Sequence, residues 1–464
     1  QDILQKLQTG VVKVILSTSA LEAGIDLPEL DCCLVRGYPG SLMSWKQRIG
    51  RVGRKNPGLV MFLPVIQNPL DNFYGNKPDL LLNGEVESAA FNPNYPTILG
   101  KHLECSCVES GIPLSEIIQR FGEVAGAIAD SLLEQEKIYI NNSNQLWGYG
   151  YPHRNVSIRG HAQNDVELIN INTGKSFEKM SISLAHKEVF PGAIYFAQNY
   201  DGDLVIYRSE NLDLDKKQAI LKPLGKNSDL ETVPICELAI QEIQQLATPK
   251  IIPTNISNAQ LKLSLFWGEI TSYVIGYRLL SIKYIKGVEK TTVIEEKSFE
   301  PPYKTEYQSP VIKVQINNVF SQIIWKNITE IKEKILEKNE GKIPNDLKDL
   351  WRCNPDFIAL HSMGHQIISA IPLVVLSSSK DVECFIQAEG GETVAYFFDT
   401  CDGGNGASEA IFNQLLKFAD KAIALAKNCD CEHGCPRCLT HHCCPQQNRG
   451  LYKDLGLLLL EAIL

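Results

Sequence analysis

The chain has 464 residues, of which 44% are hydrophobic and 21% are charged, as is usual for a globular protein of several domains. Its formal net charge of −9 at pH 7 excludes a polycation, so any contact with nucleic acid must come from a local basic patch. No apolar run reaches the roughly 18 residues that a membrane-spanning helix needs. We therefore expect a cytoplasmic protein with no membrane partner.

The first 75 residues alternate strand and helix signals. Apolar runs at residues 11–16, 30–36 and 59–65 are typical of buried parallel strands, and a helix is predicted at 44–49, capped by Ser44. Strands that alternate with helices indicate a parallel α/β sheet. The segment holds about half of such a domain, and Gln1 is not an initiator residue. We therefore expect the C-terminal part of a longer polypeptide.

Helical patterns dominate residues 76–152, and β patterns dominate residues 153–310. In the first region, prolines separate amphipathic stretches, which suits a winged helix or a small helical bundle. In the second region, short runs of β-branched and aromatic residues alternate with turn residues, which predicts a small barrel or a curled sheet. The predicted helices are 97–109, 114–121 and 125–136, and the predicted strands are 156–159, 166–171, 193–197, 204–208, 272–282 and 291–294.

Residues 311–464 return to longer helices around a buried strand. The predicted fold is therefore multidomain α/β and α+β, with a partial parallel sheet, a winged-helix-like region, a small β-rich domain and a C-terminal α/β domain. The expected elements of the C-terminal domain are helices at 323–338, 357–376, 409–426 and 451–464 and a strand at 394–398.

A basic segment extends from Arg36 to Lys55, with six lysines and arginines and no acidic residue. Arg51 and Arg54 each follow a glycine within it. Guanidinium groups grip phosphate oxygens in pairs, and glycines let the backbone come close to a ligand. The segment predicts a surface that reaches a nucleoside triphosphate, and a solvated basic helix is the alternative.

The set of motifs that ATP hydrolysis requires is incomplete in this sequence. Hydrolysis needs a phosphate-binding loop with a lysine and a carboxylate for Mg²⁺. No G-x-x-x-x-G-K-[ST] motif and no Asp-Glu-x-Asp or Asp-Glu-x-His box occurs in the chain. Residues 173–176 resemble the end of such a loop, but Ile169 stands at its first glycine position. The arginines can act on a nucleotide only where another domain supplies its site.

Five cysteines crowd into residues 429–443, and Cys444 follows directly. In a large chain, this clustering favours a reducing compartment and a metal site. Cys431 and Cys443 lie close enough to the 435–438 pair to complete a tetrahedral thiolate site, with Cys429 as a competitor for one position. Structural Zn²⁺ is expected first and an iron–sulfur cluster second. The candidate ligands are Cys429, Cys431, Cys435, Cys438 and Cys443, and the neighbouring His433, His441 and His442 are expected not to bind.

A glycine-rich turn from Asp399 to Ala407 follows the predicted strand at 394–398 and precedes a helix. A turn of this kind could bind phosphate at the start of the helix. We expect a purely structural turn, with a nucleic-acid or anion contact as the alternative.

Residues 47–54 and the upstream residues 17–26 together resemble motifs VI and V of superfamily 2 helicases. The resemblance implies that residues 1–75 are part of a second RecA-like domain. It implies that Arg51 and Arg54 are arginine fingers on the γ-phosphate and that Gln47 senses the nucleotide state. The implied binding residues are Gly24 and Asp26 for the nucleotide, and Ser17, Thr18 and Arg48 for nucleic acid.

The order of the segments, ending in a C-x-C-x-x-x-C-P-x-C cluster, resembles DNA-repair helicases of the MrfA and Hrq type over nearly the whole chain. The resemblance implies the C-terminal portion of an ATP-dependent 3′→5′ helicase or translocase on single-stranded or partly duplex DNA. It also implies a structural Zn²⁺ in a C-terminal DUF1998 or MZB domain. ATP and Mg²⁺ would bind only with a first RecA-like domain, present in cis or in trans.

Two other functions stay open. The chain could be a non-enzymatic, zinc-stabilised subunit for nucleic-acid binding or assembly, which lends its arginines to another protein. It could also be a redox protein built on the cysteine cluster, in which case the cluster would hold iron and sulfide.

Overall fold

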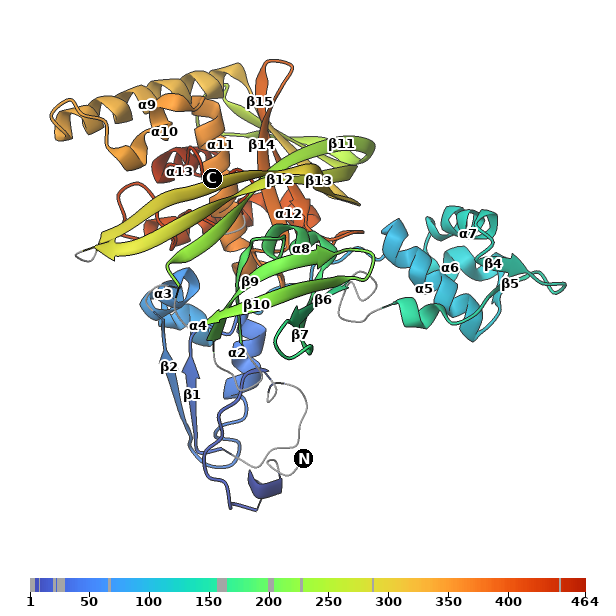
Figure 1. The fold of residues 1–464 in the computed structure, drawn as a ribbon. Helices are drawn as coiled ribbons and strands as arrows, with labels where there is room; N and C mark the ends of the chain where they lie inside the picture. Colours follow the sequence, from blue (N-terminus) through green and yellow to red (C-terminus); the bar gives the residue numbers. More distant parts are fainter. Residues whose placement is uncertain are drawn as a thin grey trace. The chain divides into compact units, whose positions relative to one another are not determined.

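The computed structural model describes residues 5–7, 9–19, 22, 30–65, 68–156, 165–198, 204–225, 228–285, 288–441 and 444–464. Helices and several sheets alternate along the chain, which confirms the predicted multidomain α/β and α+β class (Figure 1). The chain forms two compact units. Unit 1 comprises Gln1–Phe91, Gln244–Trp267 and Pro310–Leu464, and unit 2 comprises Asn92–Ile243 and Gly268–Ser309. The division into four domains stays a prediction.

The N-terminal part of unit 1 holds two parallel strands, β1 (Cys32–Arg36) and β2 (Leu59–Leu63), in the predicted places. Helix α2 (Leu42–Ile49) connects them, and α3 (Pro69–Asn76) and α4 (Pro78–Asn83) follow. Ser41, rather than the predicted Ser44, caps α2, because its side chain accepts a hydrogen bond from the Ser44 amide.

The predicted buried strand at residues 11–16 is wrong. The segment is irregular, and the side chains of Val11, Val14 and Leu16 are 74%, 81% and 97% exposed. A parallel strand needs a neighbouring strand to receive its hydrogen bonds, and among the described residues the sheet here contains only β1 and β2. The apolar run therefore suits burial, but no neighbouring strand is present in the described residues to bury it.

The C-terminal part of unit 1 packs helices on a sheet whose described order is β11-β12-β13-β15-β14, with β15 antiparallel to both β13 and β14. Helix α11 is buried on almost every side, and its polar residues His361, Ser362, His365 and Gln366 are buried with the apolar ones. It ends at Ala370, earlier than predicted, because Pro372 follows in a short 3₁₀ turn. The elements are α9 (Asn318–Lys338), α10 (Asp349–Arg352), α11 (Pro355–Ala370), β14 (Val382–Glu389), β15 (Glu392–Asp399), α12 (Ala407–Lys427) and α13 (Lys453–Ala462).

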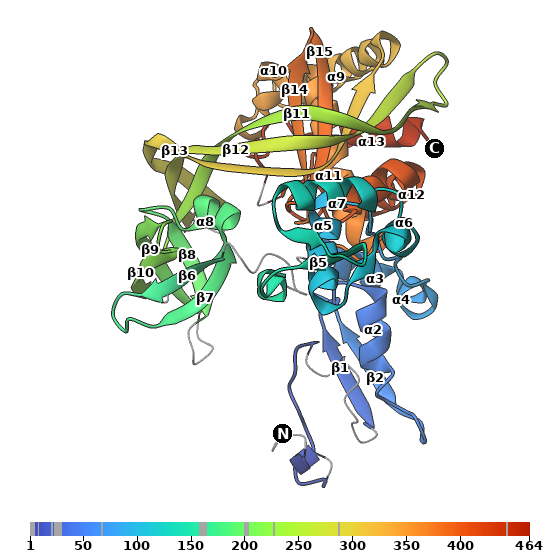
Figure 2. The ribbon, with the colours of Figure 1, turned by 90° about the vertical axis from the view of Figure 1, so that its right-hand side faces the viewer.

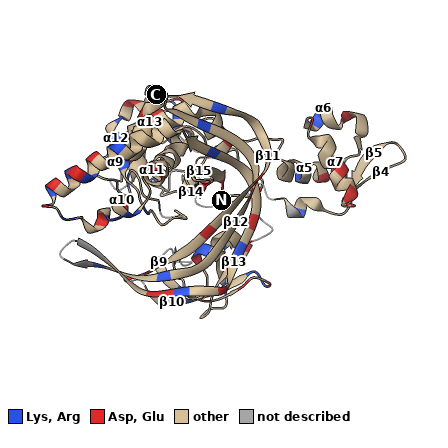
Figure 3. Ribbon diagram, turned by 90° about the horizontal axis from the view of Figure 1, so that it is seen from above, with Lys and Arg blue, Asp and Glu red and all other residues tan. Residues whose placement is uncertain are grey.

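Helix α9 has one buried apolar face and one charged, solvent-exposed face. One face buries Phe320, Ile324, Ile328 and Ile335 in the core of unit 1. The remaining surface of the helix carries both lysines and glutamates, as Figure 3 shows. The helix predicted at 323–338 is confirmed, with its start extended to Asn318.

The first part of unit 2 has the order helix, strand, helix, helix, strand, strand, which is the order of a winged helix. Its small core is drawn entirely from residues 99–146. The elements are α5 (Pro96–Glu109), β3 (Ile112–Pro113), α6 (Ile117–Phe121), α7 (Ala125–Glu134), β4 (Ile138–Ile140) and β5 (Gln145–Gly148), with β5 between β3 and β4 in the sheet.

The second part of unit 2 holds a sheet with the described order β7-β6-β10-β9-β8. Three long strands, β11, β12 and β13, run side by side and contribute to both units (Figure 2). Of the predicted strand at 156–159, residues 157–159 lie outside the described residues. The strands are β6 (Asp165–Asn170), β7 (Ser176–Ser181), β8 (Ile194–Gln198), β9 (Leu204–Asp213), β10 (Gln218–Gly225), β11 (Leu230–Pro253), β12 (Gln260–Ile285) and β13 (Val288–Ile316), with the short helix α8 (Ile182–Glu188) after β7.

Candidate metal centre and motor segment

An ion pair joins the two motif segments of the N-terminal part of unit 1. The Arg48 guanidinium contacts the Glu22 carboxylate, at 2.7 Å from Nε and 2.6 Å from Nη2. The Ser44 hydroxyl donates to the other oxygen of Glu22 at 3.0 Å. Arg48 and Glu22 are 26% and 13% exposed, so solvent screens the pair less than an open surface pair. Glu22 therefore connects the upstream motif to α2.

Arg51 and Arg54 follow α2 in a tight turn. Arg51 Nη2 donates to the Glu22 carbonyl at 2.9 Å, and Arg51 is half-buried. Arg54 is exposed, and its Nε donates to the Gly50 carbonyl at 3.1 Å. Gly53 has a φ of +70°, and a Cβ on Gly58 would lie 2.9 Å from the Gly53 nitrogen, so the turn requires glycine at both positions. The turn thus carries the half-buried guanidinium of Arg51, bonded to Glu22, and the exposed guanidinium of Arg54.

The other predicted residues of this segment are only partly placed. Gln47 lies exposed on α2, and Ser17 and Thr18 lie exposed in the irregular N-terminal segment. The predicted nucleotide ligands Gly24 and Asp26 lie outside the described residues.

A buried carboxylate holds the start of α2. Glu87 is 6% exposed and accepts hydrogen bonds from the Leu42 amide at 2.6 Å and the Met43 amide at 3.3 Å. The Tyr38 hydroxyl donates to it at 3.1 Å. Backbone amides at a helix start lack partners within the helix, so Glu87 satisfies two of them and fixes the direction of α2.

The cysteine cluster brings four sulfur atoms together in the loop between α12 and α13. The Sγ–Sγ distances are 3.5 Å from Cys429 to Cys435, 3.3 Å from Cys431 to Cys438 and 3.9 Å from Cys435 to Cys438. All four sulfur atoms lie within 4.8 Å of one another. Around a tetrahedral Zn²⁺ with bonds of about 2.3 Å, neighbouring sulfur atoms are roughly 3.8 Å apart.

This donor set fits a single Zn²⁺ ion. A cluster of several iron atoms would hold its cysteines further apart, so the geometry favours zinc over iron and sulfide. The fourth sulfur atom of the described group belongs to Cys429, which the sequence interpretation treated as a competitor for one position. Cys443, which it preferred, lies outside the described residues. His433 Nδ1 lies 3.2 Å from the Tyr452 hydroxyl, and His433 is not part of the four-sulfur group.

The local environment also favours a thiolate at Cys435. Burial alone would raise the pKa of the Cys435 thiol, but hydrogen bonds from the Arg437 amide and the neighbouring thiols lower it to about 7. Burial raises the pKa of Cys431 and Cys438, so these two thiols need the metal ion to become thiolates.

Lys453 supports the cluster from α13. This lysine is 9% exposed, and its ammonium donates to the carbonyl of Cys429 at 3.1 Å and to the carbonyl of Cys431. Its backbone amide donates to the His433 carbonyl at 2.9 Å. A divalent cation held by four thiolates carries net negative charge, which a buried ammonium nearby offsets. Lys453 thus fixes two ligand-bearing residues and supplies the compensating charge.

We expect Lys453→Met to weaken zinc binding by roughly 10- to 100-fold, as losses of groups around metal ligands do. Methionine keeps the length of the side chain but cannot donate to the two carbonyls. Competition with a chromophoric chelator measures the change. Lys427→Met is the matched control, because Lys427 pairs with Glu461 at 2.6 Å where both side chains are largely exposed. Equal zinc affinity in both variants would contradict the role of Lys453.

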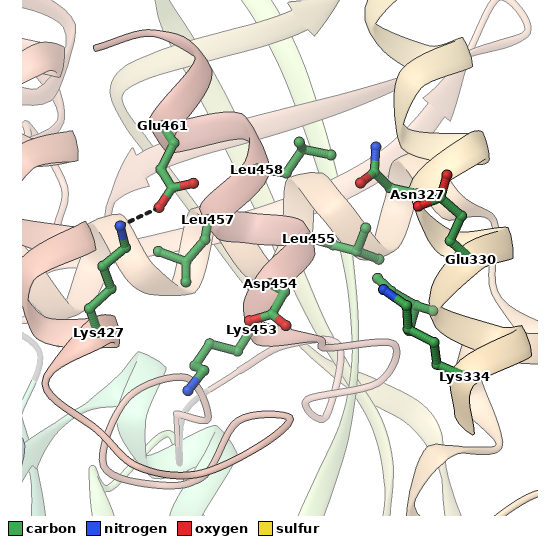
Figure 4. Close-up of a pocket in the computed structure, with 11 residues that line it drawn as sticks. Asn327, Glu330, Lys334, Lys427, Lys453, Asp454, Leu455, Leu457, Leu458 and Glu461 are labelled. Atoms are coloured by element: carbon green, nitrogen blue, oxygen red, sulfur yellow. Dashed lines mark ion pairs between the residues drawn. The ribbon is translucent and has the colours of Figure 1, made fainter. Parts of the chain in front are cut away.

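A pocket of about 590 Å³ lies beside Lys453, between α9 and α13 (Figure 4). Figure 4 shows lysines and carboxylates around it, and the ion pair of Lys427 and Glu461 closes one side. This balance of charge selects neither an anion nor a cation. The residues that line it are Asn327, Glu330, Ile331, Lys334, Lys427, Lys453, Asp454, Leu455, Leu457, Leu458 and Glu461.

The glycine-rich turn before α12 uses its amides internally. The Asp399 carboxylate accepts hydrogen bonds from the amides of Asn405, Gly406 and Ser408 at 2.8, 2.9 and 2.8 Å. Burial raises the pKa of Asp399, and these amide donors oppose that rise. Gly406 has a φ of +90°, and a Cβ there would lie 2.8 Å from the Phe91 Cα. The structural interpretation of this turn is favoured over anion binding, because these three amides already have an acceptor.

Sequence reasoning missed Glu22, Glu87 and Lys453 as supporting residues. Glu22 lay within the motif at residues 17–26, so its charge opposite a basic helix could have signalled the pair. Glu87 and Lys453 carry no local signal, since their partners lie 45 and 22 residues away in the sequence. No helix in the described ranges is long and apolar enough to cross a membrane.

Comparison with known proteins agrees with this geometry. Residues 1–56 match the family model of the helicase conserved C-terminal domain, and residues 363–439 match the model of the MrfA Zn-binding domain. The chain is 25% identical to the uncharacterized ATP-dependent helicase YprA of Bacillus subtilis, over 95% of this chain and 53% of that protein. It is 21% identical to the ATP-dependent helicase HRQ1 of Saccharomyces cerevisiae, over 98% of this chain and 40% of that protein.

A crystal structure of the DUF1998 helicase MrfA has a similar fold, with a TM-score of 0.53 at 18% identity over 99% of this chain and 56% of that one. The chain spans about half the length of the curated relatives that it matches. Its first and last parts thus match a helicase conserved C-terminal domain and an MrfA Zn-binding domain, and over nearly its whole length the chain is similar to the C-terminal part of helicases of the MrfA and Hrq type.

Proposed function

We propose that this chain supplies the second half of an ATP-dependent 3′→5′ DNA helicase or translocase that acts in DNA repair. The observation that carries the proposal is the contact of Glu22 with Arg48 and Arg51, because it fixes the arginine-bearing turn against the upstream motif. The names of YprA and HRQ1 as ATP-dependent helicases support the activity. DNA as the nucleic acid follows from the resemblance to helicases of the MrfA and Hrq type.

In this proposal, Arg51 and Arg54 stabilise the charge that develops on the γ-phosphate during hydrolysis. Glu22 holds Arg51 through its carbonyl, while Arg54 lies exposed and can reach a nucleotide on a facing domain. Gln47 senses the nucleotide state, and Gly24 and Asp26 contact the nucleotide. Ser17, Thr18 and Arg48 contribute to DNA contacts, with Arg48 also bound to Glu22.

The nucleotide itself would be bound mainly by a first RecA-like domain, present in cis or in trans, which supplies the phosphate-binding loop and the Mg²⁺ carboxylate. The chain divides in this proposal into a partial second RecA-like domain at 1–75, a winged-helix-like region at 76–152, a β-rich domain at 153–310 and a zinc domain at 311–464. The Zn²⁺ is structural, because four thiolates leave no open position for water.

The purified chain is expected to hydrolyse no ATP alone, since it has no phosphate-binding loop. ATPase activity is expected only when a first RecA-like domain from a helicase of the same type is added or fused. The measurement is phosphate release with and without single-stranded DNA. Steady DNA-stimulated hydrolysis by the chain alone would contradict the division of labour. DNA binding without activity in the fused protein would favour the non-enzymatic alternative.

A further inference from the structure

A second group of metal-binding side chains lies beside the four-cysteine site. It comprises His361 and His365 of α11 and Cys444 of the loop before α13, and one ligand atom of each lies within 4.8 Å of the others. The two histidines are four residues apart, so they occupy one face of the helix. The His361 Nε2 atom lies 3.3 Å from Cys444 Sγ.

The other ring nitrogen of each histidine already has a partner. His361 Nδ1 lies 2.8 Å from the Arg449 carbonyl, and His365 Nδ1 lies 2.8 Å from the Leu439 carbonyl. A carbonyl can only accept, so Nδ1 carries the proton in both rings and Nε2 has the lone pair. Histidines that bind metals almost always donate their second ring nitrogen to a carbonyl or carboxylate in this way.

Burial and spacing suit a small, soft divalent cation. His361 and His365 are 0% and 2% exposed, and Cys444 is half-buried. Around a tetrahedral Zn²⁺, a histidine nitrogen and a cysteine sulfur are about 3.5 Å apart, close to the observed 3.3 Å. A thiol that donates to His361 would also explain this one distance. It would not explain why His365 is fixed with the same tautomer beside the same sulfur.

We propose that His361, His365 and Cys444 form a second Zn²⁺ site, with water in the fourth tetrahedral position. The site fastens the loop between Cys438 and Tyr452 to α11, since the loop supplies the thiolate and the carbonyls of Leu439 and Arg449 fix the imidazoles. The four-cysteine site and this second site then hold the loop at two points. The inference does not depend on the proposed helicase function.

The test counts metal ions in the full chain. The protein is purified under reducing conditions, saturated with Zn²⁺, freed of loose metal and analysed by mass spectrometry for zinc per chain. The expected result is two ions per chain. With Co²⁺ in place of Zn²⁺, the sulfur-to-metal absorption should correspond to five thiolates rather than four. One ion per chain and four thiolates in the unmodified protein overturn the proposal, whatever the variants do.

Variants assign the second ion. Cys444→Ser and His361→Gln are each expected to lose one ion and to keep the ion of the four-cysteine site. Cys353→Ser is the matched control, because Cys353 is also half-buried but belongs to neither group, and it should keep both ions. Two ions retained in Cys444→Ser and in His361→Gln would place the second ion elsewhere and overturn the assignment.

Discussion

Replacing Arg54 by alanine is expected to abolish ATP hydrolysis in a motor reconstituted with a first RecA-like domain. Arginine fingers contribute on the order of 10³- to 10⁵-fold in rate in phosphoryl-transfer enzymes, because they neutralise charge that appears only in the transition state. Arg54 is exposed and its described side-chain hydrogen bond is made with the local Gly50 carbonyl, so the substitution should not disturb the fold. Equilibrium DNA binding should stay close to that of the unmodified protein.

Steady-state phosphate release and DNA affinity, measured on the same preparation, separate the possible roles of Arg54. Lys55→Ala is the control, because Lys55 is also basic and exposed and directly follows Arg54 in the chain. Loss of hydrolysis and DNA binding in equal measure would indicate a DNA contact instead of a finger. Unchanged hydrolysis would exclude Arg54 from the reaction and leave Arg51 as the candidate.

Replacing Cys438 by serine is expected to remove the zinc ion and unfold the C-terminal part of unit 1. Cys438 is 2% exposed and packs with Leu439 and Cys429 in a small cluster around the metal site. Structural zinc sites contribute roughly 10–16 kcal/mol of apparent binding free energy, whereas whole domains are stable by about 5–15 kcal/mol. Loss of the ion therefore removes most of the stability of this region.

Zinc content and thermal unfolding, followed by circular dichroism, measure this effect. Chelator treatment of the unmodified protein should lower the melting temperature at least as far, since it removes this ion as well. Cys32→Ser serves as the control, because Cys32 is exposed on β1 and belongs to neither metal-binding group. A Cys438→Ser protein with full zinc content and an unchanged melting temperature would exclude Cys438 as a ligand.

Much of the secondary structure was predictable, because most elements carry their own hydrophobic pattern. β1 and β2 lie where short apolar runs predicted parallel strands, and α12 lies within two residues of its predicted bounds. The strand at residues 11–16 failed for a physical reason. Its apolar residues predict burial, but burial depends on a partner surface that the pattern does not encode.

Some residues of the candidate sites could be predicted from local spacing, and others depend on contacts between distant segments. The spacing of Cys435 and Cys438 predicted two ligands, because a short turn fixes where both side chains lie. The choice of Cys429 depends on how the end of α12 meets the loop, which spacing alone cannot determine. Glu87 accepts from an amide of α2, and Lys453 donates to a carbonyl at the four-cysteine site. Both partners are distant in the sequence, so only the tertiary structure reveals these contacts.

The assembly of unit 1 from distant segments sets an order of folding during synthesis. Its core joins Phe73 and Tyr74 to Tyr452, Leu459 and Ile463 of the α13 region, and the Ala462 carbonyl accepts a hydrogen bond from the Asn255 amide. The small core in the first part of unit 2 needs only residues 99–146. It can therefore form on the ribosome while unit 1 still lacks α13. The N-terminal part of unit 1 is made before residues 99–146 but completes its core only after α13 is made, so its apolar residues stay exposed to chaperones in the meantime.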